Sequence, residues 1–524
     1  MESWIGPGSG GSGNVSILSY RFILFVFAAA AWFYLTPRRA RWLVLLAVSL
    51  IFYGFAGWRS LAYLLGVSGV TYGGARWLGA LKEKAGPAAK RPEKKRARAV
   101  LALTLALGLG GMIFVKYLEG VCGWVNRLLL NGGMAAAFPV PRLLAPLGLS
   151  YFTFQSAGYV IDVYRGKLPP ERNPLKYLLF VSFFPQMTQG PISAYGQLAP
   201  QLLAPRRFEP EAFVSGVLLA LWGYFKKLVL ADRLARVTAE PGQPGWLILG
   251  ALGLYMVRLY ADFSGGMDVA LGVSRMLGVD LARNFCRPFF SRSVAEYWRR
   301  WHITLGAWFR TYLFYPLTTS YAGLALGRWG KKRLGKKVGA ALPAAGATVV
   351  IFLAIGLWHA ANWNAVLYGL YFGLLLGGAQ LLESFFRKAK KRLGISERHP
   401  LWQALSMART WLLLLAAQCF VCAPAPGEAF ALLGGMLRGW GSADVLLTLT
   451  GLMPAREWLI AGLALLTLVT VDILEERGRN IGDNLAHGPF PLRWLIMLLL
   501  IVTILVFGCY GAGFDQTAFL YTNF

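Results

Sequence analysis

The sequence has few charged residues for its length. Of its 524 residues, 15% are Asp, Glu, Lys or Arg and 56% are hydrophobic, whereas a soluble protein carries about 25% charged residues. No charged residue occurs between Lys337 and Glu383, a stretch long enough to cross a bilayer twice. This scarcity excludes an ordinary soluble domain and indicates an all-α polytopic membrane protein.

Acidic residues are scarcer still, since 24 Asp and Glu stand against 53 Lys and Arg and give a net charge of +29. In a soluble protein such an excess would suggest nucleic-acid binding. Here the basic residues gather in short segments between apolar runs, the pattern of cytoplasmic loops. We therefore expect a lipid bilayer and no nucleic acid as partner. The basic segments, which we expect to be solvated loops, are 38–41, 82–98, 165–176, 328–337 and 387–392.

The residues that hold metals or form disulfides are also rare. The five cysteines are scattered, and the pair Cys419 and Cys422 lies inside an apolar run, which favours packing of free thiols over a zinc or redox site. Neither an HxxxH spacing nor a Cys/His cluster occurs, so we expect no metal. The GxSxG signature of serine hydrolases is missing as well.

Long apolar runs define the organisation of the chain. We count roughly eleven segments with spanning or re-entrant character. Residues 1–15 are glycine- and serine-rich and predict a flexible tail without a cleavable signal peptide, followed by a single membrane domain over 16–524. Within it, residues 176–382 differ, because prolines, glycines and carboxylates interrupt their apolar runs. Irregular backbone survives in a membrane only where protein or a water-filled cavity satisfies it. We expect re-entrant segments and a catalytic core there, around a central tunnel.

Two of the four histidines lie in apolar, Trp-rich sequence. His359 lies in the uncharged stretch beside Trp358, where an ionisable group predicts a functional site; packing in a tight loop between two spans is the alternative. His302 closes a segment that begins at Glu296. If this segment is helical, Arg299 and His302 share a face, which suits a phosphate-bearing donor beside a proton-transfer group. The alternative is a Trp/Arg belt at the headgroup level.

Several motifs, taken in order, resemble the membrane-bound O-acyltransferases, and within them the branch that acetylates alginate and transfers D-alanine to teichoic acid. The resemblance covers most of the chain. It rests on PLGLSYFTFQ at 146–155, YVIDVYR at 159–165, FFPQ at 183–186, GPI at 190–192, GYFKK at 223–227, DFSG at 262–265, NFCRPF at 284–289, EYWRRWHITL at 296–305, GLWH at 356–359 and the aromatic end FLYTNF at 519–524.

The resemblance implies a multi-pass enzyme of a bacterial plasma membrane, with the all-α fold of this family. It implies transfer of an acyl group, acetyl first, from a cytoplasmic thioester donor to a hydroxyl of a cell-surface polysaccharide. The donor would be acetyl-CoA or an acyl-phosphopantetheine carrier protein, used as a co-substrate without a tightly bound cofactor. A secreted esterase-like acetyltransferase of the SGNH type is a further expected partner.

The resemblance also assigns roles to individual residues. His359 matches the catalytic histidine, which would act as general base, and His302 matches a second functional position. The residues expected to bind donor or substrate are Trp298, Arg299, Arg300, Trp358, Asp262 and Ser264. Transfer of D-alanine from a carrier protein to teichoic acid is the alternative reaction. A transporter or flippase would also use broken helices and intramembrane charge and is the third reading.

Overall fold

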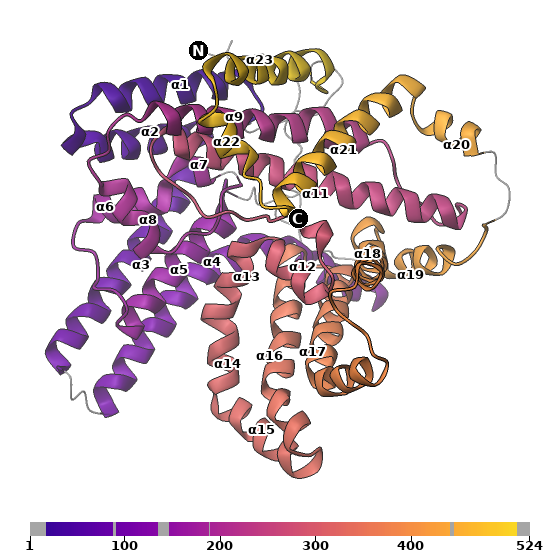
Figure 1. Ribbon diagram of the computed structural model, residues 1–524. Helices are drawn as coiled ribbons and strands as arrows, with labels where there is room; N and C mark the ends of the chain where they lie inside the picture. The colour runs from indigo at the N-terminus through magenta and orange to yellow at the C-terminus, as the bar shows by residue number, and fades with distance from the viewer. Residues whose placement is uncertain (1–16, 87–90, 135–145, 188, 441–444, 511–524) are drawn as a thin grey trace.

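The computed structural model describes residues 17–86, 91–134, 146–187, 189–440 and 445–510. Within these ranges every regular element is a helix. Figure 1 shows α3, α4 and α5 side by side at the lower left, and α14, α16 and α17 descending from the centre. The tail 1–15 and the aromatic segment 519–524 lie outside the described residues.

Eight helices in the described part of the chain are long and apolar enough to cross a membrane. They cover Arg91–Asn131, Pro210–Leu234, Gly245–Met276, Lys336–His359, Trp363–Arg392, Pro400–Cys422, Ala455–Glu476 and Phe490–Phe507. The shorter apolar helix Tyr20–Leu35 accompanies them. The predicted all-α polytopic membrane protein is confirmed, whereas the number of spans, roughly eleven by our reading of apolar runs, stays a prediction.

The N-terminal helices differ from the sequence prediction in the basic stretch 82–98. There α3 continues to Ala85 and α4 begins at Arg91, so the expected loop is wrong for 82–85 and for 91–98. α4 then continues without a break to Asn131. The elements are α1 (Tyr20–Leu35), η2 (Arg38–Ala40), α2 (Arg41–Phe55), α3 (Trp58–Ala85), α4 (Arg91–Asn131) and α5 (Leu149–Arg165).

The middle of the chain is interrupted, as its prolines and glycines predict. Its elements are α6 (Pro174–Ser182), α7 (Phe184–Met187), α8 (Tyr195–Leu203), α9 (Pro210–Tyr224), the π-helical η3 (Phe225–Ala231), α10 (Asp232–Leu234) and α11 (Gly245–Met276). Gly265 lets α11 lie directly on α9, because a Cβ there would be 2.8 Å from the Gly223 carbonyl oxygen. The glycines after Asp262 therefore serve close helix packing.

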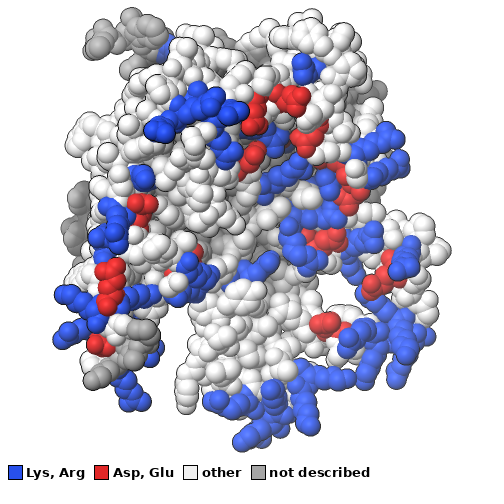
Figure 2. Space-filling model, turned by 60° about the vertical axis from the view of Figure 1, so that its left-hand side comes forward, with Lys and Arg blue, Asp and Glu red and all other residues white. Residues whose placement is uncertain are grey.

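A series of short elements connects this region to a long helical hairpin. They are η4 (Pro288–Phe290), α12 (Val294–Arg300), α13 (Ile303–Phe309), the π-helical η5 (Arg310–Phe314), α14 (Tyr315–Thr319) and α15 (Tyr321–Arg333). The hairpin consists of α16 (Lys336–His359) and α17 (Trp363–Arg392). The basic segments 328–337 and 387–392, expected to be loops, lie mostly within α15, α16 and α17, so that expectation is wrong for them. Figure 2 shows Lys and Arg gathered at the lower edge of the molecule, below broad uncharged surface.

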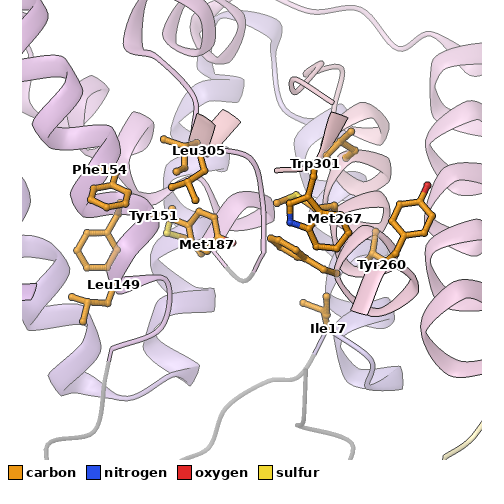
Figure 3. Close-up of a cluster of buried hydrophobic side chains, with 14 of the residues drawn as sticks. Ile17, Leu149, Tyr151, Phe154, Met187, Tyr260, Met267, Trp301 and Leu305 are labelled. Carbon is orange, nitrogen blue, oxygen red and sulfur yellow. The ribbon is translucent and has the colours of Figure 1, made fainter. Parts of the chain in front are cut away.

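The remaining helices are α18 (Pro400–Cys422), α19 (Pro426–Gly435), α20 (Val445–Leu452), α21 (Ala455–Glu476), α22 (Ile481–Ala486) and α23 (Phe490–Phe507). The core joins these parts through buried aromatic and aliphatic side chains. Figure 3 shows one section of it, with Tyr151 and Phe154 of α5 on one side, Leu305 of α13 in the middle, and Trp301 near Met267 on the other. This section lies around the segment that carries His302.

Candidate functional site

His359 is the last residue of α16 and lies where the chain turns into α17. The two helices touch here, since a Cβ at Gly356 would lie 2.2 Å from the Ala365 carbonyl oxygen. Asn362 then caps α17 by accepting a hydrogen bond from the Ala365 amide at 2.8 Å. The 24 residues of α16 span about 36 Å. His359 is therefore a bilayer thickness away from the basic end of the same helix.

Two side chains of α4 hold the end of α16. The Lys116 ammonium donates to the Trp358 carbonyl oxygen, and the Tyr117 hydroxyl donates to the Leu357 carbonyl oxygen at 2.6 Å. The Lys116 Nζ also lies 5.1 Å from the centre of the Trp358 ring. A cation at a helix C-terminus is stabilised by the helix dipole, so Lys116 fixes the backbone from which His359 projects.

His302 lies in a break between two short helices. α12 ends at Arg300, and His302 adopts a left-handed conformation with φ 46° before α13 begins. The expectation that Arg299 and His302 lie three residues apart on one continuous helix is therefore wrong. The break is held by residue 284, whose carbonyl oxygen accepts the Ile303 amide at 3.0 Å. His is among the residues that tolerate this backbone region best.

Asn284 also orients the His302 ring. Its Oδ1 accepts hydrogen bonds from the Thr304 amide at 2.9 Å and the Thr304 hydroxyl at 3.0 Å. This leaves the Asn284 amide nitrogen facing His302 Nδ1 at 3.2 Å. An amide nitrogen can only donate, so Nδ1 is the acceptor and a neutral His302 carries its proton on Nε2. His302 is thereby set as a hydrogen-bond donor through Nε2.

The two histidines line adjoining cavities. One cavity of about 120 Å³ is lined by His359 together with Tyr297, Trp298, Trp301, Asn364, Tyr368 and Gln418. The other, of about 250 Å³, is lined by His302 together with Trp298, Arg299, Leu305, Arg310 and Phe352. Trp298 belongs to both linings and so lies between the cavities. A single continuous tunnel stays a prediction.

Four buried polar atoms beside these cavities have no hydrogen-bond partner among the described residues. They are Trp298 Nε1, Asn364 Oδ1, Gln418 Oε1 and Gln380 Oε1. Asn364 and Gln418 are 4% and 3% exposed, and a buried polar atom without a partner costs about 1–3 kcal/mol. Such atoms at the wall of a cavity indicate a place where a polar ligand binds.

The predicted aromatic residues join the two histidines. The Trp358 ring centre lies 4.7 Å from that of His359 and 6.3 Å from that of His302. Trp298 packs edge-on against Phe352 and Phe372, with ring centres 5.1 Å apart in both pairs. Residues 298, 302, 358 and 359, drawn from distant parts of the sequence, thus form one site.

The two predicted arginines lie in different surroundings. Arg299 is exposed and lines the His302 cavity. Arg300 instead forms ion pairs with Glu296 at 2.8 Å and Glu476 at 2.9 Å. The hydrogen bonds that Arg300 donates to Glu476, together with the negative charge of that carboxylate, raise the pKa of Arg300 above its usual value. Arg299 is therefore placed for a ligand, whereas Arg300 ties α12 to α21.

Asp262 and Ser264 lie apart from this site. The Lys227 ammonium donates to Asp262 at 2.5 Å, and the Lys226 ammonium donates to Ser264 at 2.8 Å. Neither residue lines a histidine cavity. Phe263, between them, does reach the site, with its ring centre 4.9 Å from that of His302. The structure therefore places the two predicted binding residues in a buried ionic cluster on α11.

Sequence reasoning missed four polar residues of the site, namely Lys116, Asn284, Asn364 and Gln418. Lys116 directly follows an uncharged run, and a lysine in that position is usually interpreted as the end of a membrane-spanning segment. Asn364 and Gln418 are polar residues inside apolar helices, a signal that was available. Asn284 opens one of the matching motifs, but its contact with His302 depends on tertiary structure.

Fold and site together define an all-helical membrane protein with two histidines on adjoining buried cavities. No family model matches the chain. It is 33% identical over 352 residues to the protein named "Probable alginate O-acetylase" from Azotobacter vinelandii, covering 66% of this chain and 64% of the relative. It is 32% identical over 390 residues to the protein of the same name from Pseudomonas syringae, covering 73% and 67%.

A third relative, named "Teichoic acid D-alanyltransferase", comes from Bacillus subtilis and is 29% identical over 262 residues, covering 48% of this chain and 63% of the relative. The chain belongs to the membrane-bound O-acyltransferase family. The aligned part spans about two-thirds of the length of these relatives.

Proposed function

We propose that the protein is a membrane O-acyltransferase that moves an acetyl group from a cytoplasmic thioester donor to a hydroxyl of a cell-surface polysaccharide. The observation that carries the proposal is the meeting of His302 and His359 around Trp358, at the wall of two cavities that Trp298 separates. The relatives named alginate O-acetylase support acetyl as the acyl group and a polysaccharide as the acceptor.

The two histidines take different roles in the proposed reaction. His359 accepts the proton of the acceptor hydroxyl as that oxygen attacks the thioester carbonyl. His302, which donates through Nε2, stabilises the negative charge that develops on the carbonyl oxygen. The carbon–sulfur bond then breaks, and the departing thiolate takes up the proton held by His359. The products are an ester and a free thiol.

The positions of the cavities support entry of the two substrates from opposite sides. Arg299 and Arg310 line the His302 cavity, and arginines suit the phosphates of a CoA or phosphopantetheine donor. His359 lies at the end of α16 opposite Lys336 and Lys337, whose basic segment the positive-inside pattern assigns to the cytoplasm of a bacterial cell. The acceptor would then reach His359 from the outer face.

D-alanyl transfer from a carrier protein to teichoic acid is the second candidate, supported by the relatives with that name. It uses the same histidines and differs in donor and acceptor. An acyl carrier protein would be the partner for D-alanylation, and a secreted SGNH-type protein the partner for acetylation. A transporter or flippase would leave the thioester intact, so consumption of the donor separates it from both enzymes.

The first test is His359→Ala in purified protein reconstituted into vesicles. Release of free thiol from acetyl-CoA in the presence of polysaccharide measures the reaction. We expect turnover to fall to background because the general base is lost, while membrane insertion and thermal stability are retained. The matched control is His399→Ala, an exposed histidine at the start of α18. Turnover retained in His359→Ala would refute the assignment.

A further inference from the structure

A third cavity, of about 400 Å³, lies apart from both histidine cavities, between α9, α11, α21, α22 and α23. This is within the usual range of small-molecule sites, about 300–1,000 Å³. Its walls include the apolar side chains Leu219, Trp222, Val471, Ile496 and Leu500. They continue the exposed apolar faces of α21 and α23, on which Leu463, Leu466 and Leu499 lie. A cavity bounded in this way is open to acyl chains.

Charged residues line the same cavity in equal numbers of each sign. The cations are Lys226, Arg275, Arg283 and Arg287, and the anions are Asp268, Asp472, Glu475 and Asp483. Three pairs satisfy most of them. These pairs are Lys226 with Asp268 at 2.8 Å, Arg275 with Asp483 at 3.5 Å, and Arg287 with Glu475 at 3.4 Å.

One cation and one anion of the cavity wall take part in none of these three pairs. Within the described residues, Arg283 and Asp472 form no salt bridge, although both line the cavity. Asp472 is buried at 8% exposure, beside the Tyr260 hydroxyl and the Lys226 ammonium, whereas Arg283 is exposed. The Lys226 ammonium is already paired with Asp268 at 2.8 Å, and a buried carboxylate is costly unless a cation is paired with it. The remaining pair of charges therefore fits a ligand that carries both signs.

The depth of the cavity agrees with a lipid headgroup. The Arg283 segment follows Met276, whose carbonyl oxygen accepts the Tyr34 hydroxyl at 2.8 Å. Tyr34 lies just before the basic corner Arg38–Ala40, which the positive-inside pattern assigns to the cytoplasmic face. Arg275, which lines the cavity and directly precedes Met276, thus lies at the cytoplasmic headgroup level, and the apolar walls of the cavity face the bilayer interior.

We infer that this cavity binds a phospholipid of the cytoplasmic leaflet whose headgroup carries a phosphate and a primary ammonium. Arg283 pairs with the phosphate, the arrangement that guanidinium groups favour. Asp472 accepts hydrogen bonds from the ammonium, and the acyl chains lie along α21 and α23. This site is separate from the proposed acyl transfer and does not rest on it. It adjoins the proposed catalytic histidines through Asn284, which lines the cavity and contacts His302.

The test is a lipid titration of detergent-purified, delipidated full-length protein, followed by native mass spectrometry. The probes are phosphatidylethanolamine, phosphatidylcholine and phosphatidylglycerol with identical acyl chains. We expect phosphatidylethanolamine to bind about tenfold more tightly than the other two. A quaternary ammonium cannot donate hydrogen bonds to Asp472, and a glycerol headgroup carries no cation, so both lipids lose the charge-assisted hydrogen bonds to this carboxylate.

Two variants locate the site. Arg283→Gln and Asp472→Asn should each weaken binding of phosphatidylethanolamine about tenfold, and Asp472→Asn should also abolish its preference over phosphatidylcholine. Arg39→Gln, an exposed arginine in η2, is the matched control and should bind as the parent does. Because Arg283 is exposed, we expect Arg283→Gln to fold even if Asp472→Asn, at a buried residue, does not. Equal binding of the three lipids, or unchanged binding in Arg283→Gln, would overturn the inference.

Discussion

Two buried polar regions approach each other at Phe263 of α11, whose ring contacts His302, and they differ in how their polar atoms are satisfied. Around Lys227 every charge has a partner, since its ammonium pairs with Asp262 at 2.5 Å and Asp232 at 2.7 Å. Around the two histidines, Trp298, Asn364 and Gln418 keep polar atoms without partners at cavity walls. In the sequence, Asp262 and His359 are equally good candidates for functional residues. Of these two regions, the one around the histidines has polar atoms that remain available to a ligand.

The energetic consequences of the two arrangements also differ. Removing one member of a buried ion pair leaves an uncompensated charge and costs about 3–5 kcal/mol. Removing a group that acts on a transition state costs activity and leaves stability almost unchanged. Mutations can therefore separate a region that holds helices together from one that performs chemistry.

The largest effect is expected for Lys227→Met. It leaves Asp262, 1% exposed, and Asp232 without their shared ammonium. We expect a loss of about 3–5 kcal/mol of stability, measured as a large fall in the thermal unfolding midpoint in detergent. Turnover per folded molecule should stay near that of the parent.

The matched control is Lys167→Met. Lys167 pairs with Asp162 at 3.5 Å, but its side chain is 52% exposed, and exposed pairs contribute about 0–1 kcal/mol. If Lys227→Met instead kept its stability and lost turnover, the Lys227 cluster would belong to the catalytic site and the distinction between the two regions would fail.

The second effect concerns His302→Asn. Asparagine tolerates the left-handed backbone of this position, but its amide is too short to replace Nε2. Loss of one donor to a developing oxyanion lowers kcat by about 10²–10³-fold, with an unchanged unfolding midpoint. His487→Asn, at an exposed histidine that lies 3.3 Å from Glu211, should behave as the parent. A loss of stability without loss of kcat per folded molecule would make His302 structural.

The sequence predicted the class of fold because the determining signal is local. Long uncharged runs indicate membrane helices, and the prolines at 185 and 191 indicate that the helices of the middle region are interrupted. The errors in helix boundaries arose where a helix continues beyond its apolar run into basic residues. Residues 82–98 are rich in Lys and Arg and therefore suggest a loop, but lysine and arginine favour helix, and α3 and α4 extend through most of this stretch.

The site was predictable only in part, for the same reason. His302 and His359 stand out as ionisable residues in apolar sequence. By the same signal Asp262 stands out too, and nothing local reveals that Lys227 neutralises it. The role of Asn284 depends on its contact with His302, which lies 18 residues away in the sequence and is brought close only by folding. Partners far apart in sequence decide which buried polar group is satisfied, and a single sequence does not display them.

A third, smaller effect is expected for Asn284→Asp. The carboxylate still accepts the hydrogen bonds of Thr304, but its second oxygen cannot donate to His302 Nδ1. The proton of a neutral His302 then moves to Nδ1 and leaves Nε2, so the donor to the oxyanion is lost. We expect kcat per folded molecule to fall about tenfold or more with the donor KM unchanged, and the unfolding midpoint to fall as well, because the new carboxylate is buried. An unchanged kcat would show that the position of this proton does not matter.

The smallest effect separates two neighbouring arginines that the sequence does not distinguish. Arg299 lines the His302 cavity, so Arg299→Gln should raise the donor KM by about two- to fivefold, the contribution of one exposed charge contact. Arg300 is already paired with Glu296 and Glu476. Arg300→Gln should therefore leave the donor KM unchanged and lower the unfolding midpoint slightly. If Arg300→Gln raised the donor KM and Arg299→Gln did not, the donor phosphates would bind on the α21 side of α12. Arg300 would then belong to the ligand-binding region and not to the region of satisfied ion pairs.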